Sequence, residues 1–193
     1  MKEVFFMRHG LTIENELSII VGSSDPSLSE RGRQEIHSLK EHVVKPDIVL
    51  SSDLKRAYET AKILFPNIDV KAIPQLRERD FGVLEGKPIE SSRKTGLMQS
   101  QDEETLRKNG VETPSSLLSR ANQVASMISQ MQAQKIVVVS HGTLINYVLK
   151  IMLPENARIE MLKHTHYHKI VLDSDEKVID VIMNQSWLDN HPI

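Results

Sequence analysis

The stretch IVVVSHG, residues 136–142, is a short β-branched apolar run that ends abruptly in polar residues. Such a run, closed by a serine, a histidine and a glycine, predicts a buried strand followed by a sharp loop. The stretch VFFMRHG, residues 4–10, has the same form, and Ile48–Leu50 likewise ends at Ser51-Ser52-Asp53. We therefore expect three buried strands, each with potentially reactive side chains at its carboxyl end.

Helical segments alternate with these strands. Ser29 is suited to cap a helix over about Glu30–Val43, which Pro46 ends. Thr113 and Pro114 open a long helix that reaches about Gln132. Alternating strands and helices predict an α/β domain with a largely parallel sheet. The other expected elements are helices over about Leu54–Leu64 and Leu144–Met152 and a strand at Val70–Ile73.

Two further segments complete the chain. His168–Leu172 and Val178–Met183 flank Asp173–Lys177 and predict a hairpin. The polar segment at about 85–112 has no strand pattern, and we expect a lid-like insertion there, with a solvated surface loop as the alternative. At roughly 100–200 residues per domain, residues 1–193 are expected to form a single domain.

Composition excludes several classes of protein. The chain of 193 residues has no cysteine, which excludes disulfide frameworks, iron–sulfur clusters and cysteine nucleophiles. Lys and Arg total 24 against 26 Asp and Glu, so no basic excess indicates a nucleic-acid partner. No stretch approaches the ~20 apolar residues of a membrane span, and no signal-peptide core is present. We expect a cytoplasmic protein with neither a membrane nor a nucleic-acid partner, and the oligomeric state stays open.

The polar residues at the strand ends are those that phosphoryl chemistry needs. Ligands of open α/β sheets bind outside the carboxyl ends of the strands, so we expect these residues to converge. Arg8 and Arg56 would match a phosphate dianion with planar, multi-donor cations. A neutral imidazole can attack phosphorus and carry the group covalently. The leaving alkoxide needs a proton, for which Glu78 and Glu85 are the candidate donors.

Five segments, taken together and in order, resemble the histidine phosphatase superfamily, also called phosphoglycerate mutase-like. Arg8-His9-Gly10 opens a long signature, and Val138–Gly142 resembles the family's last block. A lone Arg-His-Gly would be a weak signal, whereas five ordered segments are a strong one. The matching segments are 8–34, 51–61, 76–86, 112–120 and 138–142.

The resemblance implies a fold and a set of roles. The implied fold is a three-layer α/β/α sandwich, mostly parallel, with an antiparallel edge strand. His9 matches the nucleophile that becomes phosphohistidine, and Glu78 matches the general acid that later activates water. No metal ion and no organic cofactor are implied. The implied phosphate pocket consists of Arg8, Asn15, Arg56 and His141.

Several of these residues have a second interpretation. Arg56 could instead face solvent on its helix, and Asp53 is better suited to cap that helix than to act as an acid. Glu85, just before Gly86, fits a turn or a supporting role, although it is the alternative proton donor. Asp80 is a further candidate acid.

Three histidines near the end of the chain suggest another possibility. His164, His166 and His168 share one face of a possible strand, a pattern that also suits metal ligands. We favour an exposed polar strand face over a metal site. The family more often has Asn or another small polar residue where this chain has His164, a departure that concerns substrate contacts rather than the chemistry.

The expected function is metal-independent hydrolysis of a small phosphomonoester through a phosphohistidine intermediate. The mutase branch resembled here has a longer insertion with adjacent arginines, whereas this chain has no Arg-Arg pair. This difference favours a phosphatase over phosphoglycerate mutase-type transfer, and an inactive binding or regulatory module is a third possibility. Lys87, Arg93 and Lys94 suggest a second anionic group on the substrate, with simple solvation as the alternative.

Overall fold

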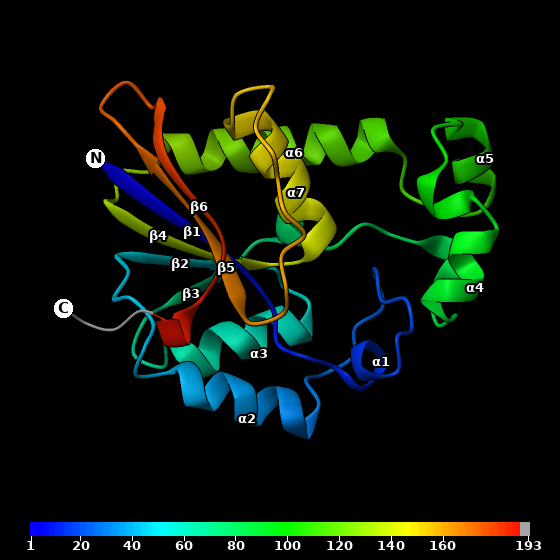
Figure 1. Cartoon of the computed structure of the whole chain (residues 1–193), viewed down its shortest axis with the longest axis horizontal. Helices are drawn as coiled ribbons and strands as arrows, with labels where there is room; N and C mark the ends of the chain where they lie inside the picture. The colour runs from blue at the N-terminus through cyan, green and yellow to red at the C-terminus, as the bar shows by residue number, and fades with distance from the viewer. Residues whose placement is uncertain (190–193) are drawn as a thin grey trace.

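The computed structural model describes residues 1–189, which contain a six-stranded sheet in the order β3-β2-β4-β1-β5-β6 (Figure 1). β3, β2, β4 and β1 run parallel to one another, whereas β5 is antiparallel to β1 and β6 is antiparallel to β5. The mostly parallel sheet is confirmed, and its antiparallel edge is the predicted hairpin. The strands are β1 (Lys2–Arg8), β2 (Ile48–Ser51), β3 (Val70–Ala72), β4 (Lys135–Ser140), β5 (His166–Leu172) and β6 (Val178–Ser186).

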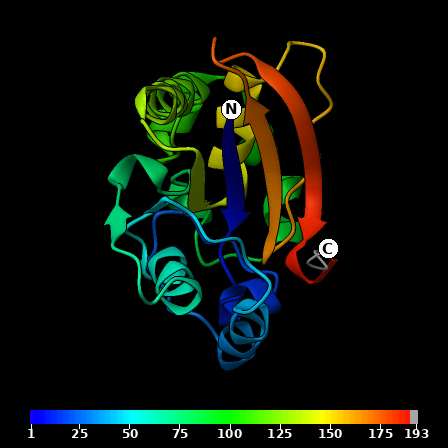
Figure 2. The ribbon, with the colours of Figure 1, turned by 90° about the vertical axis from the view of Figure 1, so that its left-hand side faces the viewer.

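Helices cover both faces of this sheet. α6 and α7 pack on one face and α2 and α3 on the other, so the predicted three layers are confirmed (Figures 1 and 2). The helices are α1 (Ile13–Glu16), α2 (Glu30–Leu39), α3 (Lys55–Leu64), α4 (Ile89–Lys94), α5 (Glu103–Lys108), α6 (Pro114–Gln130) and α7 (Gly142–Met152).

The middle of β1, residues Val4–Met7, is apolar at every position because both of its faces are buried. Val4 and Phe6 of β1 point into the core beneath α6 and α7, whereas Phe5 and Met7 point into the core beneath α2 and α3. Successive side chains of a strand alternate between faces, so a strand covered on both sides needs apolar residues at every position. The apolar run in β4 has the same cause.

The helix predicted over Glu30–Val43 ends earlier, at Leu39. Ser29 caps it as expected, because its hydroxyl accepts from the backbone N–H of Gly32. Beyond Leu39 the chain turns, and the N–H of His42 donates to the carbonyl of Leu39 instead of continuing the helical pattern. Val43 still packs against the core, which explains why its spacing resembled a continued helix.

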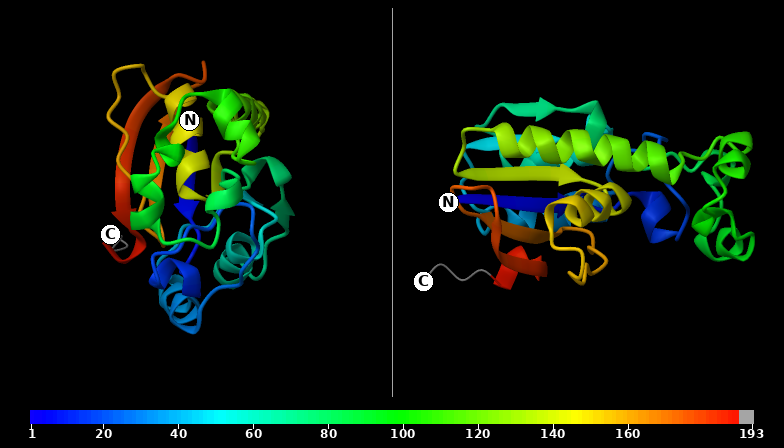
Figure 3. Two further views of the ribbon diagram at one scale, coloured as in Figure 1. Left: turned by 90° about the vertical axis from the view of Figure 1, so that its right-hand side faces the viewer. Right: turned by 90° about the horizontal axis from the view of Figure 1, so that it is seen from above.

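The segment predicted as an insertion stands beyond the carboxyl ends of the parallel strands (Figures 1 and 3). It holds α4, α5 and a 3₁₀ turn, and its Ile89 and Met98 pack against a small separate core around Phe81. A lid role for residues 85–112 stays a prediction. So does the single domain 1–193, whose last four residues lie outside the described residues. Over the described chain, no helix is long and apolar enough to cross a membrane.

Candidate active site

The two His-Gly turns leave the sheet side by side. Arg8 ends β1 and pairs in register with Ser140 at the end of β4, so His9 and His141 follow adjacent strands. Arg56 reaches the same place from the first turn of α3. His9, Arg56 and His141 are all buried, which rules out the solvent-facing alternative for Arg56. The fold therefore brings these side chains together, as predicted.

His9 is held in one orientation and one tautomer. Its Nδ1 lies 2.6 Å from the carbonyl oxygen of Gly10, and because a carbonyl only accepts, Nδ1 carries the proton. Nε2 therefore keeps its lone pair and accepts from Nε of Arg56 at 3.3 Å. The Gly10 N–H in turn donates to the hydroxyl of Thr60 on α3. An imidazole with a lone pair on Nε2 is what nucleophilic attack requires.

Two groups beside His9 lack hydrogen-bond partners among the described residues. The ring of His141 lies 4.9 Å from that of His9, centroid to centroid, and neither of its nitrogens is paired. Nε of Arg8 is also unpaired, although another nitrogen of this guanidinium donates to the carbonyl of Leu162. Leaving a buried polar group unpaired costs about 1–3 kcal/mol. An anion bound against His9 would satisfy these groups.

The guanidinium of Arg56 is anchored from the opposite side. It donates to the carbonyls of Ser24 and Gly22, at 2.7 and 2.8 Å. Gly22 is a glycine for a steric reason, because a Cβ there would lie 2.4 Å from a carboxylate oxygen of Glu85 and 2.5 Å from the carbonyl oxygen of Arg79. The loop that holds Arg56 is thereby packed directly against the segment that follows Glu78.

Burial sets the charges in the site. It lowers the pKa of both His9 and His141 well below the usual histidine range, and the nearby cations Arg8 and Arg56 lower these pKa values further. Burial also lowers the pKa of the two guanidinium groups, to about 10 for Arg56, while Glu78 raises both. At neutral pH the site therefore combines two neutral imidazoles with two cations, which suits a dianionic phosphate.

Glu78 is fixed by the backbone of α7. Its Oε1 accepts from the N–H groups of Arg79 (2.9 Å) and Leu144 (3.3 Å), and its Oε2 accepts from Thr143 (3.2 Å). Thr143 and Leu144 lie in the first turn of α7, whose N-cap residue His141 makes no side-chain cap bond. Glu78 therefore caps this helix from a distant part of the chain, and the helix holds its carboxyl beside the buried guanidinium groups.

Glu85, the alternative proton donor, is engaged elsewhere. Its carboxylate accepts from the backbone of Ser23 (2.7 Å), Ser24 (2.8 Å) and Phe81 (3.1 Å). Burial alone would raise the pKa of Glu85, but these hydrogen bonds lower it below its usual value. The carboxylate form is thus the stable one, and Glu85 ties two loops together. Asp80 has a comparable local task, accepting from the N–H of Gly82.

The interpretation of Asp53 as a helix cap is wrong. The N-cap of α3 is Leu54, which has no side chain able to cap, and the carboxylate of Asp53 pairs with Arg77 at the surface. The capping carboxylate comes instead from Asp25, which accepts from the N–H of Lys55 at 2.6 Å. A cap supplied across 30 residues leaves no local pattern in the sequence.

The three late histidines do not form one exposed strand face. His164 precedes β5, its Nδ1–H donates to the carbonyl of His9 at 3.0 Å, and its ring lies 5.0 Å from that of His9. Burial, followed by the charge of Arg8, lowers the pKa of His164 to about 3. His168 is fully buried, so the expected exposed face is wrong. No group of three metal-binding side chains occurs within residues 1–189. His164 is therefore a third neutral imidazole beside His9.

Asn15 lies near these groups but is partly occupied. Its carbonyl oxygen accepts from the N–H of Thr12, and its own N–H donates to the hydroxyl of Thr12. The pair forms a capping box for α1. Asn15 also lines a cavity together with Arg8 and Glu78. Its contact with the phosphate or its surroundings stays a prediction.

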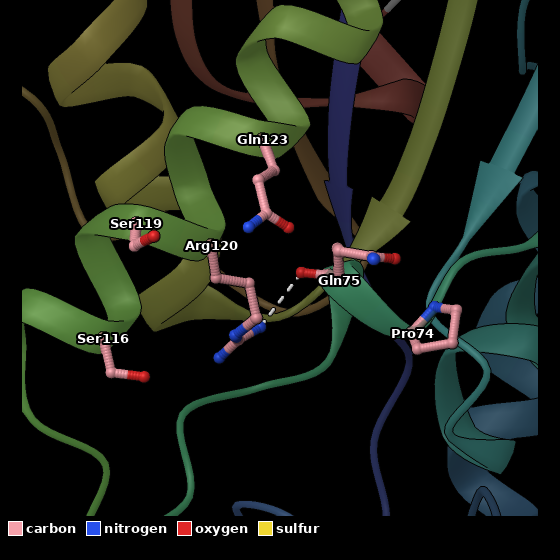
Figure 4. Close-up of a pocket in the computed structure, with 6 residues that line it drawn as sticks. All are labelled: Pro74, Gln75, Ser116, Ser119, Arg120 and Gln123. Atoms are coloured by element: carbon pink, nitrogen blue, oxygen red, sulfur yellow. Dashed lines mark hydrogen bonds between the residues drawn. The ribbon is translucent and has the colours of Figure 1, made fainter.

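Arg120 supports the loop that carries Glu78. Arg120 belongs to the matching segment 112–120, but the sequence did not indicate this supporting role. From α6 it donates to the backbone carbonyls of Gln75 and Glu78, at 3.0 and 3.2 Å, and closely to that of Arg77. Figure 4 shows it reaching from α6 toward Gln75. Glu112 holds the guanidinium in place, at 2.7 Å and 3.1 Å from its two oxygens. These bonds fix the loop from which Glu78 projects.

The chain is similar to known proteins along most of its length. It is 31% identical over 169 residues to a protein of Yersinia enterocolitica named "Probable phosphoglycerate mutase GpmB", covering 79% of this chain and 75% of that one. The alpha-ribazole phosphatase of Shigella flexneri has a TM-score of 0.78 at 22% identity, covering 95% and 96% of the two chains. A phosphoserine phosphatase of Entamoeba histolytica, solved with 3-phosphoglyceric acid, has a TM-score of 0.76 at 23% identity, covering 93% and 94%.

These solved structures share the fold of this chain. The family description "Histidine phosphatase superfamily (branch 1)" matches residues 4–185, a range that includes every candidate site residue named above. The predicted enzyme class, a phosphoric monoester hydrolase of the histidine phosphatase type, is confirmed at the level of the family. The chain belongs to the histidine phosphatase superfamily.

Proposed function

We propose that this chain is a phosphatase that hydrolyses a small phosphomonoester through a phosphohistidine on His9, with no metal ion. The observation that carries the proposal is the lone pair of His9 Nε2, surrounded by the buried donors of Arg8, Arg56 and His141. A phosphoryl group placed there meets a nucleophile and the positive charge that its oxygens require. The cytoplasmic location expected from the sequence stays a prediction.

The first step transfers the phosphoryl group to the enzyme. Nε2 of His9 attacks phosphorus, a nitrogen–phosphorus bond forms, and the bond to the ester oxygen breaks. Glu78 gives its proton to the departing alkoxide. The bond from Nδ1–H to the carbonyl of Gly10 stabilises the positive charge that the ring gains. Arg8 and Arg56 stay bound to the phosphoryl oxygens throughout.

The second step returns the enzyme to its starting state. The carboxylate of Glu78 takes a proton from a water molecule as that water attacks phosphorus. The bond between phosphorus and Nε2 breaks, phosphate leaves, and His9 is neutral again. Glu78 therefore acts as the general acid in the first step and as the general base in the second.

A mutase would need to hold a second phosphate during the reaction. Among the described residues, the cavity beside Arg8 and Glu78 has one further cation, Arg93. Lys87 does not line it, and Lys94 pairs with Glu90 on the exposed surface of α4. One exposed arginine is a poor match for a second dianion, so hydrolysis is the better-supported outcome. Release of p-nitrophenol from p-nitrophenyl phosphate, compared with isomerisation of 3-phosphoglycerate, separates a phosphatase from a mutase and from an inactive module.

Activity is expected to survive dialysis against EDTA. Arg8 and Arg56 already supply the charge that a dianion needs, and no metal takes part in either proposed step. Phosphate release from p-nitrophenyl phosphate, measured before and after chelation, checks this. If chelation abolishes activity and zinc or manganese restores it, metal independence is wrong.

Arg120→Lys is expected to slow hydrolysis of an alkyl phosphate about tenfold more than that of p-nitrophenyl phosphate. A lysine cannot hold Glu112 and three carbonyls at once, so the loop carrying Glu78 loses its fixed position. The measurement is kcat on both substrates for Arg120→Lys, Glu78→Gln and the double variant. The double variant should be hardly slower than Glu78→Gln, since both changes act on one proton transfer. Equal losses on both substrates would show a merely structural role for Arg120.

A further inference from the structure

The cavity that meets both Arg8 and Glu78 has a volume of about 280 Å³. In the proposed reaction these two residues contact the phosphoryl group and the ester oxygen. Whatever is bonded to that oxygen must therefore occupy this cavity. The side chains that line it therefore indicate what the organic part of the substrate is.

The walls of this cavity are mostly apolar, and the exposed Arg93 of α4 is the one charged side chain of the described lining besides Arg8 and Glu78. One wall is the loop Ile19–Val21, and another is formed by Phe81 together with Ile89 and Met98 of the insertion. Met161, which is 68% exposed, lines it from the segment before β5. Methionines adapt to ligands of different outline and pack favourably against aromatic rings.

Few polar groups are available for hydroxyl groups of a ligand. The neutral polar side chains of the lining are Asn15 and Thr143, and the carbonyl oxygen of Asn15 already accepts from Thr12. A sugar or glycerol moiety would lose its hydration against these walls and regain few hydrogen bonds, from Arg93, Thr143 and Asn15, which is unfavourable. An apolar group gains from the same burial.

A second cavity, of about 490 Å³, also touches Glu78 but is a weaker candidate for this half of the substrate. Arg8 does not line this second cavity, so the organic group of an ester whose phosphate is bound by Arg8 would not lie directly in it. Its arginines are already paired with carboxylates, Arg77 with Asp53, Arg107 with Glu103 and Arg120 with Glu112.

We infer that the preferred substrates are phosphomonoesters of small apolar alcohols, aromatic or branched aliphatic, rather than phosphates of sugars or of glycerol. This inference rests on the proposed function, because it uses the positions of the phosphate and of the leaving oxygen. It adds to that function a substrate class, assigned by Ile19–Val21, Phe81, Ile89, Met98 and Met161.

The test compares 2-phenylethyl phosphate with glycerol 1-phosphate. Both release a primary alcohol, and the glycerol leaving group is the slightly better one, so a preference for the phenylethyl ester reflects binding rather than reactivity. We expect kcat/KM to favour 2-phenylethyl phosphate by about tenfold or more, since small apolar differences in such pockets give roughly 10–200-fold discrimination. A ratio near one, or a preference for glycerol 1-phosphate, would overturn the inference.

A double variant, Met98→Gln with Met161→Gln, locates the preference in the cavity. Glutamine has a similar length but needs hydrogen bonds, so the ratio of the two kcat/KM values should fall about tenfold. The matched control is Leu118→Gln with Leu188→Gln, two exposed leucines outside the cavity, which should keep the ratio of the unmodified protein. If both double variants behave alike, the cavity does not select the substrate.

Calorimetry separates this inference from the proposed reaction. 2-Phenylethylphosphonate and 2-hydroxyethylphosphonate cannot be hydrolysed, so their binding is measurable even if the chemistry is wrong. Tighter binding of the phenylethyl compound, lost in the Met98 and Met161 double variant, supports the cavity assignment whether or not phosphate is released. Equal binding of the two phosphonates, with normal turnover of p-nitrophenyl phosphate, overturns the inference and leaves the proposed function intact.

Discussion

His9→Ala is expected to retain less than about a hundredth of the turnover of the unmodified protein. In the proposed mechanism the formation of the bond between Nε2 and phosphorus is the first chemical step, which an alanine at position 9 cannot perform. The rings of His141 and His164 lie close to that of His9. The nitrogen that Arg56 faces, however, is Nε2 of His9, so a phosphoryl group bound by Arg56 lies next to His9. A hundredfold loss corresponds to about 3 kcal/mol of activation barrier. Phosphate release under saturating p-nitrophenyl phosphate measures it.

The folded state of the variant has to be verified, because His9 is buried. Circular dichroism and a urea melt of His9→Ala serve this purpose, and His37→Ala, an exposed histidine on α2, is the matched control with unchanged turnover. Rapid quench of the unmodified protein with labelled substrate should trap an acid-labile, base-stable adduct. If folded His9→Ala keeps more than about a hundredth of the rate, the covalent mechanism is wrong.

Glu78→Gln is expected to slow the hydrolysis of an alkyl phosphate by roughly 10²–10⁴, the usual worth of general acid–base catalysis. The loss should be much smaller for p-nitrophenyl phosphate, because its leaving group scarcely needs a proton. Glutamine can still accept from the first turn of α7 through its carbonyl oxygen, so the position of the side chain is largely kept. The measurement is kcat for both substrates, in the same buffer.

Glu85→Gln is the decisive comparison, because Glu85 is the alternative donor. Its carboxylate binds the backbone of Ser23, Ser24 and Phe81, so its loss should affect both substrates alike. Glu90→Gln, an exposed change on α4, should affect neither. A leaving-group-dependent loss in Glu85→Gln, and not in Glu78→Gln, would exchange the roles of the two carboxylates.

The strands and their reactive ends could be predicted because each depends on local sequence. Ile136–Val139 and Val4–Met7 are apolar at every position, which a strand buried on both faces requires. Parallel strands end at the same edge of the sheet, so the residues that follow them had to meet. His9 and His141 are neighbours for that reason.

The supports of the site could not be predicted in the same way. Arg120 holds the Glu78 loop through backbone carbonyls, which every residue has and no sequence pattern reveals. Asp25 caps α3 and Glu78 caps α7 across long separations along the chain. His164 resembled an exposed or metal-binding histidine until the fold placed it against the carbonyl of His9.

The sequence by itself therefore determined the layered α/β architecture, the family and the pair of strand-end histidines. These follow from hydrophobic periodicity and from short ordered motifs. Only the tertiary structure placed Glu78 against the first turn of α7 and Glu85 against the backbone of Ser23 and Ser24. It also brought His164 beside His9 and assembled the mostly apolar cavity around Phe81 and Met98. Each of these depends on contacts between segments far apart in the chain, whose geometry is set by packing and not by the identity of neighbouring residues.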